Sequence, residues 1–128
     1  MKRILIVDDD LSTTESIGSF LSESGYEVKT AANGIEGLEI AKKMDPDLII
    51  TDIKMPKLNG FEMFFALRGM NYKKPIIFIS SYDSIETNGK DFEVFVQMEK
   101  PINIFELSRH IEKLLGVTKL PLEYYSLN

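Results

Sequence analysis

The sequence contains no cysteine, only one histidine, and no apolar run that approaches the length of a membrane span. Without cysteine the chain can form neither a disulfide scaffold nor a thiolate metal site. The N-terminal apolar run, Ile4 to Val7, is too short for a secretory signal peptide. Together these absences favour a cytoplasmic protein that does not contact the membrane.

Basic residues are fewer than acidic ones. The 128 residues carry 15 lysines and arginines against 20 aspartates and glutamates, which gives a net charge of −5 and a pI near 4.9. Because binding to a phosphate backbone requires a basic face, we expect no direct nucleic-acid binding by this domain. The hydrophobic fraction of 44% and the charged fraction of 27% are those of an ordinary globular protein with a single core.

Short apolar runs alternate with longer amphipathic stretches, and this rhythm predicts an α/β fold with helices on both faces of a five-stranded parallel sheet. The first, third and fourth predicted strands are almost entirely apolar, as expected for strands that are buried on both faces. The second alternates more, which favours an edge position. The predicted strands are Arg3–Val7, Tyr26–Thr30, Leu48–Thr51, Pro75–Ile79 and Val94–Gln97.

Five helices are expected between and after these strands. A short helix is predicted from Phe61 to Arg68, and the polar segment Tyr82–Phe92 predicts a fourth helix that is short or irregular. The last residues, 117–128, have no helical periodicity and are interpreted as a tail or the start of a linker after a domain spanning 1–116. Three residue pairs have the form of a capping box at a helix start: Ser12 with Glu15, Asn33 with Glu36, and Asn103 with Glu106.

The short helix after Pro56–Gly60 is unusually apolar, with Phe61, Met63, Phe64 and Phe65 close together. A helix packed on a sheet buries only one stripe, so we expect Phe65 to point outward. A single exposed ring without function is the favoured interpretation. The alternative is a docking patch for a kinase, a second copy or an effector.

Polar side chains capable of phosphoryl-transfer chemistry follow four of the five predicted strands. In an open parallel sheet, functional groups gather at the carboxyl ends of the strands, so these residues are expected to meet at one edge. They are Asp8 and Asp9 after the first strand, Asp52 after the third, Ser80 after the fourth and Lys100 after the fifth.

Three clustered carboxylates repel one another, and a bound hard cation such as Mg²⁺ is the simplest way to offset this repulsion. One carboxylate can then act as a nucleophile and form an acyl phosphate. Ser80 would donate a hydrogen bond to the phosphoryl group, and Lys100 would supply positive charge. Taken singly, each residue has a structural explanation. Asp10 is expected to be a turn former or helix cap, and His110 a surface or half-buried structural histidine.

With these residues in place, the sequence resembles the receiver domain of bacterial two-component response regulators. The similarity covers about Lys2 to Leu115 in the right order and spacing. It implies a flavodoxin-like sheet with strand order 2-1-3-4-5. The matching motifs are Ile4-Leu5-Ile6-Val7-Asp8-Asp9-Asp10, Asp47-Leu48-Ile49-Ile50-Thr51-Asp52-Ile53-Lys54-Met55-Pro56 with Asn59-Gly60, Pro75-Ile76-Ile77-Phe78-Ile79-Ser80, and Lys100-Pro101.

The resemblance implies that Asp52 is the phosphorylation site. Asp8 and Asp9 would bind Mg²⁺, with Asp52 and the main-chain carbonyl of Lys54 as further ligands. Ser80 matches the switch hydroxyl, and Lys100 matches the lysine of the family, with a cis bond to Pro101.

The implied phosphoryl donor is a phosphohistidine on a separate sensor histidine kinase or phosphotransfer protein. The implied receiver of the signal is an effector domain or a downstream protein. The sequence leaves open whether the chain forms a homodimer.

Two features depart from the family pattern. The family usually has a tyrosine or phenylalanine three residues before the lysine, where this chain has Gln97. The segment from Ser80 to Lys100 is also shorter than usual. Both departures touch the region that normally reads out phosphorylation, so the acceptor chemistry is predicted to be intact while the readout is expected to be unusual.

Two other functions stay open at this point. A degenerate receiver would act only as a protein-binding module, and the replacement of the aromatic residue by Gln97 is compatible with it. A small aspartyl-phosphate phosphohydrolase also uses a strand-end aspartate with Mg²⁺. That class normally has a second acid two residues after the nucleophile, where this chain has Lys54, and a cap domain for which the chain has no room. A non-enzymatic signalling domain is therefore preferred.

Overall fold

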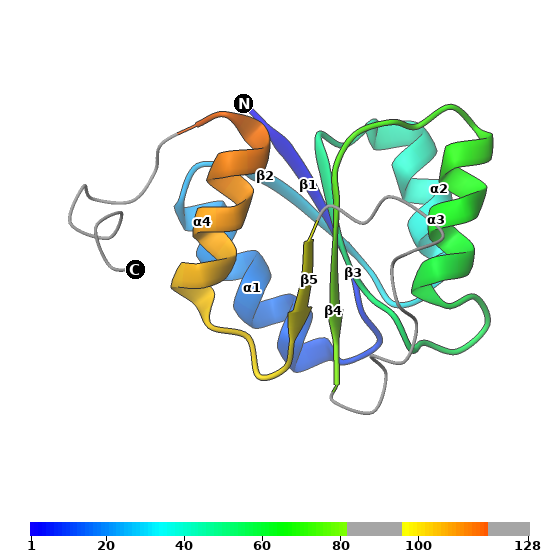
Figure 1. The fold of residues 1–128 in the computed structure, drawn as a ribbon, viewed down its shortest axis with the longest axis horizontal. Helices are drawn as coiled ribbons and strands as arrows, with labels where there is room; N and C mark the ends of the chain where they lie inside the picture. The colour runs from blue at the N-terminus through cyan, green and yellow to red at the C-terminus, as the bar shows by residue number, and fades with distance from the viewer. Residues whose placement is uncertain (82–95, 118–128) are drawn as a thin grey trace.

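The computed structural model describes residues 1–81 and 96–117 and confirms the predicted α/β fold (Figure 1). Within these residues, five parallel strands form one sheet in the order β2-β1-β3-β4-β5, which is the order predicted. The strands are β1 (Arg3–Val7), β2 (Glu27–Ala31), β3 (Leu48–Asp52), β4 (Ile76–Ser80) and β5 (Val96–Glu99).

Helices cover both faces of the sheet: α1 and α4 lie on one side, and α2 and α3 on the other (Figure 1). Four helices occur in the described ranges, so α4 is the element predicted as the fifth helix. The fourth predicted helix, Tyr82–Phe92, lies outside these ranges, as does most of the predicted tail. The four are α1 (Leu11–Glu23), α2 (Gly34–Met44), α3 (Gly60–Gly69) and α4 (Ile104–Leu115).

The burial of the strands follows the sequence pattern closely. All five residues of β3 and of β4 are buried, as are the last four of β1, because helices cover both faces of the sheet there. β2 lies at the edge and exposes most of its side chains, as predicted. β1 has the predicted bounds. The last strand begins at Val96 among the described residues and continues to Glu99, two residues past the predicted end.

Two of the three predicted helix caps are confirmed and one is wrong. Asn33 and Asn103 accept hydrogen bonds from backbone N–H groups at the starts of α2 and α4. Ser12 does not cap α1. That helix begins earlier, because the Asp10 carboxylate accepts hydrogen bonds from both the backbone N–H and the hydroxyl of Ser12. Asp10 is therefore the helix cap, the structural role expected for it.

A capping box that the sequence analysis missed begins α3. The Asn59 side chain accepts from the backbone N–H of Glu62, and the Glu62 carboxylate accepts from the backbone N–H of Asn59. This reciprocal pair fixes where the loop after β3 ends. The loop carries the residues that directly follow Asp52.

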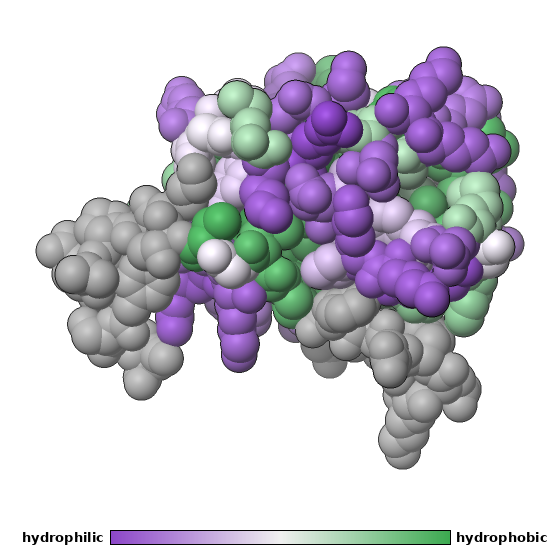
Figure 2. All heavy atoms as spheres, turned by 90° about the horizontal axis from the view of Figure 1, so that it is seen from above, coloured by the Kyte–Doolittle hydropathy of each residue, from purple (hydrophilic) through white to green (hydrophobic). Residues whose placement is uncertain are grey.

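The core consists of two clusters, one on each face of the sheet. Phe78 packs with Met63 and Phe64 of α3 on one face, and Ile79 packs with residues of α1 and α4 on the other. Viewed from above, the surface is largely hydrophilic, with a group of hydrophobic side chains left of the centre and smaller hydrophobic areas toward the right edge (Figure 2). Within the described residues, no helix is long and apolar enough to cross a membrane.

Candidate functional site

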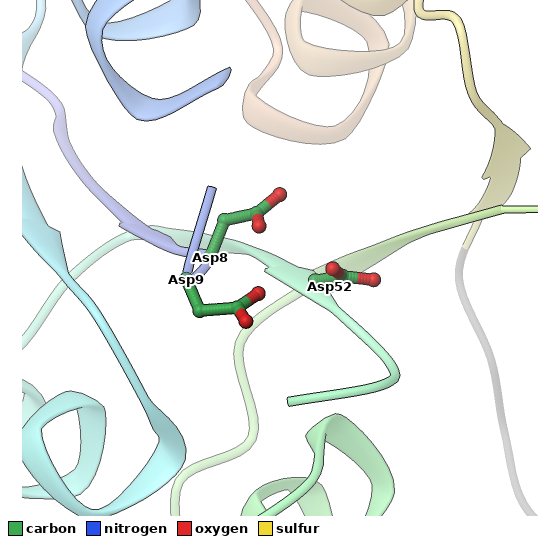
Figure 3. A group of neighbouring side chains, drawn as sticks. All are labelled: Asp8, Asp9 and Asp52. Atoms are coloured by element: carbon green, nitrogen blue, oxygen red, sulfur yellow. The ribbon is translucent and has the colours of Figure 1, made fainter. Parts of the chain in front are cut away.

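Three aspartates gather at the carboxyl ends of β1 and β3, as predicted from their positions in the sequence. One carboxylate oxygen from each of Asp8, Asp9 and Asp52 lies within 4.8 Å of the others. Asp8 and Asp52 are buried, whereas Asp9 is exposed. Figure 3 shows the side chains of Asp8 and Asp9 extending from the end of β1 toward the side on which Asp52 lies. The group therefore has a buried base and one side open to solvent.

Sheet pairing and one main-chain contact fix the position of Asp52. β3 is paired on both sides, with β1 and with β4, so its carboxyl end is held firmly. The Asp52 Oδ1 atom accepts a hydrogen bond of 2.8 Å from the backbone N–H of Ile53. This bond orients the carboxylate, whose remaining lone pairs are free for other partners.

Lys100, at the end of β5, reaches into the acidic group. Its Nζ atom lies 3.0 Å from Asp8 Oδ2 as an ion pair and donates a 3.2 Å hydrogen bond to Asp52 Oδ2. Burial lowers the pKa of Lys100, but its contacts with Asp8 and Asp52 outweigh burial and raise that pKa above its ordinary value. Lys100 thus carries a positive charge between two carboxylates. Its peptide bond to Pro101 is cis, as predicted.

The negative charge of Asp8 is unfavourable even with the positive charge of Lys100 beside it. Burial raises the pKa of its carboxyl group above the ordinary value, and the negative charge of Asp52 adds to the effect. The hydrogen bond from the Asp10 backbone N–H and the contact with Lys100 act in the opposite direction without cancelling it. An additional positive charge at this point would stabilise the ionised cluster.

The donor set fits a hard divalent cation such as Mg²⁺. All three side chains offer carboxylate oxygens, which are the ligands that this ion prefers, and the open side leaves room for the waters it retains. Lys54 lies in the loop after Asp52 with an exposed side chain. The role of its main-chain carbonyl as a further ligand stays a prediction.

Ser80 ends β4 and is fully buried, and its hydroxyl has no hydrogen-bond partner in the part of the chain that the structure describes. A buried hydroxyl without a partner is unusual, because it forfeits the hydrogen bonds it makes in water. The main chain holds the residue in place, since the Ser80 carbonyl accepts a 2.7 Å hydrogen bond from the Lys100 N–H. His110, in contrast, lies on α4 beside Glu106, half-buried as expected.

Comparison with known proteins agrees with this arrangement. Residues 4–112 match the model of the response regulator receiver domain. The chain belongs to this family. It is 36% identical over 119 residues to the response regulator MprA of Mycobacterium tuberculosis and 37% identical over 119 residues to MprA of Mycobacterium leprae. In both cases the match covers 91% of the chain and 52% of the relative, so the chain spans about half the length of these curated relatives.

Solved receiver structures share the fold. The response regulator TrrA of Thermotoga maritima, determined in complex with Mg²⁺ and beryllofluoride, matches with a TM-score of 0.81 and 35% identity, covering 90% of this chain and 100% of that one. The chemotaxis protein CheY4 of Vibrio cholerae matches with a TM-score of 0.80 and 35% identity, covering 90% and 99%. This chain is thus a receiver domain in both sequence and fold.

Two glycines at the site were not recognised as functional from the sequence. A methyl group on Gly60 would overlap the carbonyl oxygen of Asp52, and one on Gly34 would overlap the carbonyl oxygen of Leu58. Both glycines allow a helix start to approach the loop after β3 closely. Two signals were present in the sequence: Gly60 belongs to the Asn59-Gly60 part of the receiver motif, and each glycine directly follows a capping residue, Asn59 or Asn33.

Proposed function

We propose that this receiver domain accepts a phosphoryl group on Asp52 from a phosphohistidine of a sensor kinase or phosphotransfer protein, with Mg²⁺ bound by Asp8, Asp9 and Asp52. The observation that carries the proposal is the position of Lys100, whose ammonium group bridges Asp8 and Asp52 at the edge of the sheet where the three carboxylates meet. An aspartate with a purely structural role does not need a lysine and two further carboxylates around it.

In the proposed step, a carboxylate oxygen of Asp52 forms a bond to phosphorus as the phosphorus–nitrogen bond of the donor histidine breaks. The electron pair of that bond stays on the imidazole nitrogen, which takes up a proton from solvent or the donor protein. The Ile53 N–H holds the Asp52 carboxylate in one orientation during the attack. Lys100 stays close enough to neutralise charge on the transferred group.

The remaining groups complete this site. Bound Mg²⁺ would supply positive charge that offsets both the carboxylates and the incoming phosphoryl oxygens. Asp8 and Asp9 would hold the ion, and the main-chain carbonyl of Lys54 is proposed as a further ligand. The buried Ser80 hydroxyl would donate its hydrogen bond to a phosphoryl oxygen, which gives this unpartnered group an acceptor.

The stoichiometry of phosphorylation tests the proposal against its alternatives. Incubation with acetyl phosphate and Mg²⁺, followed by intact mass, is expected to show one phosphoryl adduct per chain and none when EDTA replaces Mg²⁺. Turnover of many equivalents of acetyl phosphate would instead indicate a phosphohydrolase. A chain that stays unlabelled with Mg²⁺ would be a degenerate receiver that acts only by binding partners.

We further propose that residues 1–116 form the receiver and that 117–128 are a tail or the start of a linker. A sensor histidine kinase or phosphotransfer protein would deliver the phosphoryl group in the cytoplasm. The phosphorylated domain would then act on an attached effector domain, a downstream protein or a second copy of itself.

A further inference from the structure

Ser80 is not the only buried polar group on β4 and β5 that lacks a partner. Gln97, on β5, buries its amide nitrogen Nε2, which also has no hydrogen-bond partner among the residues that the structure describes. Each unmade hydrogen bond at a buried atom costs stability, so two such atoms on neighbouring strands call for an explanation.

Both side chains point to the same face of the sheet. Gln97 is level with Phe78 in the parallel pairing of β4 and β5, and Ser80 follows Phe78 by two residues on the same strand. Side chains two residues apart, or level on adjacent strands, share a face. Phe78 belongs to the core cluster on the α2 and α3 side, so Ser80 and Gln97 face that side as well.

The spacing brings the two groups within reach of each other. Adjacent strands are about 4.8 Å apart and rise about 3.3 Å per residue, which places the Cα atoms of Ser80 and Gln97 about 8 Å apart. A long side chain spans such a diagonal. Glu99, which is level with Ser80 on β5, is exposed. Side-chain rotation alone can therefore bring the amide to the hydroxyl.

The chemistry of the two groups fixes the direction of a bond between them. Phosphoryl oxygens only accept hydrogen bonds, so a hydroxyl that contacts one must donate its proton to it. The hydroxyl oxygen then has lone pairs left that need a donor. The Gln97 amide is a donor, whereas a phenylalanine side chain at this position would have no donor.

We propose that Gln97 is a positioning residue that donates from Nε2 to Ser80 Oγ when Ser80 donates to the phosphoryl group on Asp52. This inference rests on the proposed function and deepens it. Both buried atoms lack partners among the described residues of the unphosphorylated chain, and both would gain one on phosphorylation. The relay replaces the movement of an aromatic side chain with a hydrogen bond, and it ties the state of Asp52 to the middle of β5.

The first test follows the Gln97 side-chain amide by NMR, with its signal assigned by its loss in Gln97→Met. Beryllofluoride and Mg²⁺ stand in for the phosphoryl group, and fluorine NMR reports independently whether beryllofluoride is bound. The relay predicts that the amide protons of Gln97 shift downfield on binding in the wild type. In Ser80→Ala, at beryllofluoride concentrations that still saturate the site, they stay in place.

The outcomes separate the relay from the function on which it rests. Bound beryllofluoride with an unmoved Gln97 amide in the wild type would overturn the relay and leave the phosphoacceptor function standing. The same would follow from an equal shift in Ser80→Ala. A chain that binds no beryllofluoride at all would contradict the function, and the relay with it.

In the second test, one substitution is expected to raise the stability of the unphosphorylated chain and to weaken beryllofluoride binding. A residue with a merely structural role would not produce both effects. Methionine matches glutamine in length but cannot donate a hydrogen bond. Gln97→Met is expected to raise the urea midpoint of the unphosphorylated chain, because a buried donor without a partner is removed. The same variant should weaken beryllofluoride binding by about two- to tenfold, the worth of one hydrogen bond.

A double-mutant cycle tests whether Gln97 acts through Ser80. In a Ser80→Ala background, Gln97→Met should leave beryllofluoride affinity unchanged, because the acceptor of the amide is already gone. If the two substitutions weaken binding independently, so that their effects multiply, Gln97 acts by another route and the relay is wrong.

Discussion

Asp8 and Asp10 lie two residues apart, yet their surroundings act on their carboxyl groups in opposite directions. Burial beside Asp52 raises the pKa of Asp8, so its negative charge is unfavourable in the folded chain. The hydroxyl of Ser12 lowers the pKa of Asp10, so its charge is favourable there. One residue is suited to binding a cation, and the other begins a helix.

This contrast predicts opposite effects of the same substitution. A group whose pKa is raised by folding costs stability once pH exceeds that pKa. Asp8→Asn should therefore raise the free energy of unfolding near pH 7 without Mg²⁺. Asp10→Asn should lower it, because a carboxylate with a depressed pKa contributes stability at neutral pH. Urea unfolding in EDTA measures both values.

The effect of Mg²⁺ on stability is the control for these two substitutions. The ion should stabilise the wild type and Asp10→Asn but not Asp8→Asn, which has lost one of the three carboxylates. Destabilisation by Asp8→Asn in EDTA would show that its ion pair with Lys100 outweighs the cost of its burial, contrary to the present account.

At the scale of elements, helix starts pack against the loop that follows Asp52. Gly60, the first residue of α3, leaves no room for a side chain beside the Asp52 carbonyl. Gly69, the last residue of the same helix, has nothing within 4 Å of the place where a Cβ atom would lie. The two glycines thus offer a comparison within one helix.

Gly60→Ala is expected to destabilise the chain by about 1–3 kcal/mol through overpacking, and to weaken Mg²⁺ binding because Asp52 must shift. Gly69→Ala should raise stability slightly, by about 0.5 kcal/mol, because alanine restricts the unfolded chain. Thermal unfolding and Mg²⁺ titration of the two variants check both results. Equal effects on Mg²⁺ binding would refute a specific role for the start of α3.

α3 also provides adjacent buried and exposed rings. Phe64 is buried on Phe78, whereas Phe65 is 53% exposed, as the sequence predicted. Phe64→Ala is expected to cost about 3–5 kcal/mol of stability and Phe65→Ala less than about 1 kcal/mol. Urea unfolding measures both losses. Phe65→Ala with unchanged stability and unchanged partner binding would exclude the docking-patch interpretation and leave a harmless exposed ring.

Elements that depend on short sequence patterns were the most predictable. Apolar runs bounded by polar residues located the strands within one or two residues, because burial on both faces leaves little choice of side chain. Helix starts were less certain, since Asp10, Ser12 and Glu15 all have side chains that can cap. The choice among them depends on where β1 ends, which is a property of the sheet.

At the scale of the whole molecule, a groove runs beside the acidic site. It has a volume of about 700 Å³ and lies between α1 and the segment from Lys100 to Ile104. Ile17 and Phe20 of α1 line it together with Ile102, and the polar side chains of Ser12, Thr13 and Ser16 line it as well. The protein proposed to carry the phosphohistidine would approach Asp52 past this neighbouring surface.

We predict that filling this groove blocks a protein donor but spares a small one. Ser16→Arg should slow phosphotransfer at least about tenfold from a histidine kinase that labels the wild-type chain, through steric exclusion from the interface. Labelling by acetyl phosphate should be unchanged. Ser19→Arg, an exposed position on α1 that does not line the groove, is the control and should affect neither reaction. Equal rates for both variants with the kinase would contradict this docking site.

The sequence predicted that Asp8, Asp9 and Asp52 lie close together, because topology alone brings the ends of parallel strands to one edge. It could not show which buried polar atoms lack partners. The sequence singles out both Ser80 and Gln97, but their missing hydrogen-bond partners among the described residues depend on the packing around them. The close approaches at Gly34 and Gly60 are likewise properties of the assembled helices and loops.

The identity of the phosphorylated residue tests the central claim most directly. Wild type, Asp52→Asn and Asp10→Asn would be incubated with acetyl phosphate and Mg²⁺ and compared by intact mass. The account predicts one phosphoryl adduct on the wild type and on Asp10→Asn, and none on Asp52→Asn, because the amide is not a nucleophile of comparable strength. An adduct of equal yield on Asp52→Asn would contradict it.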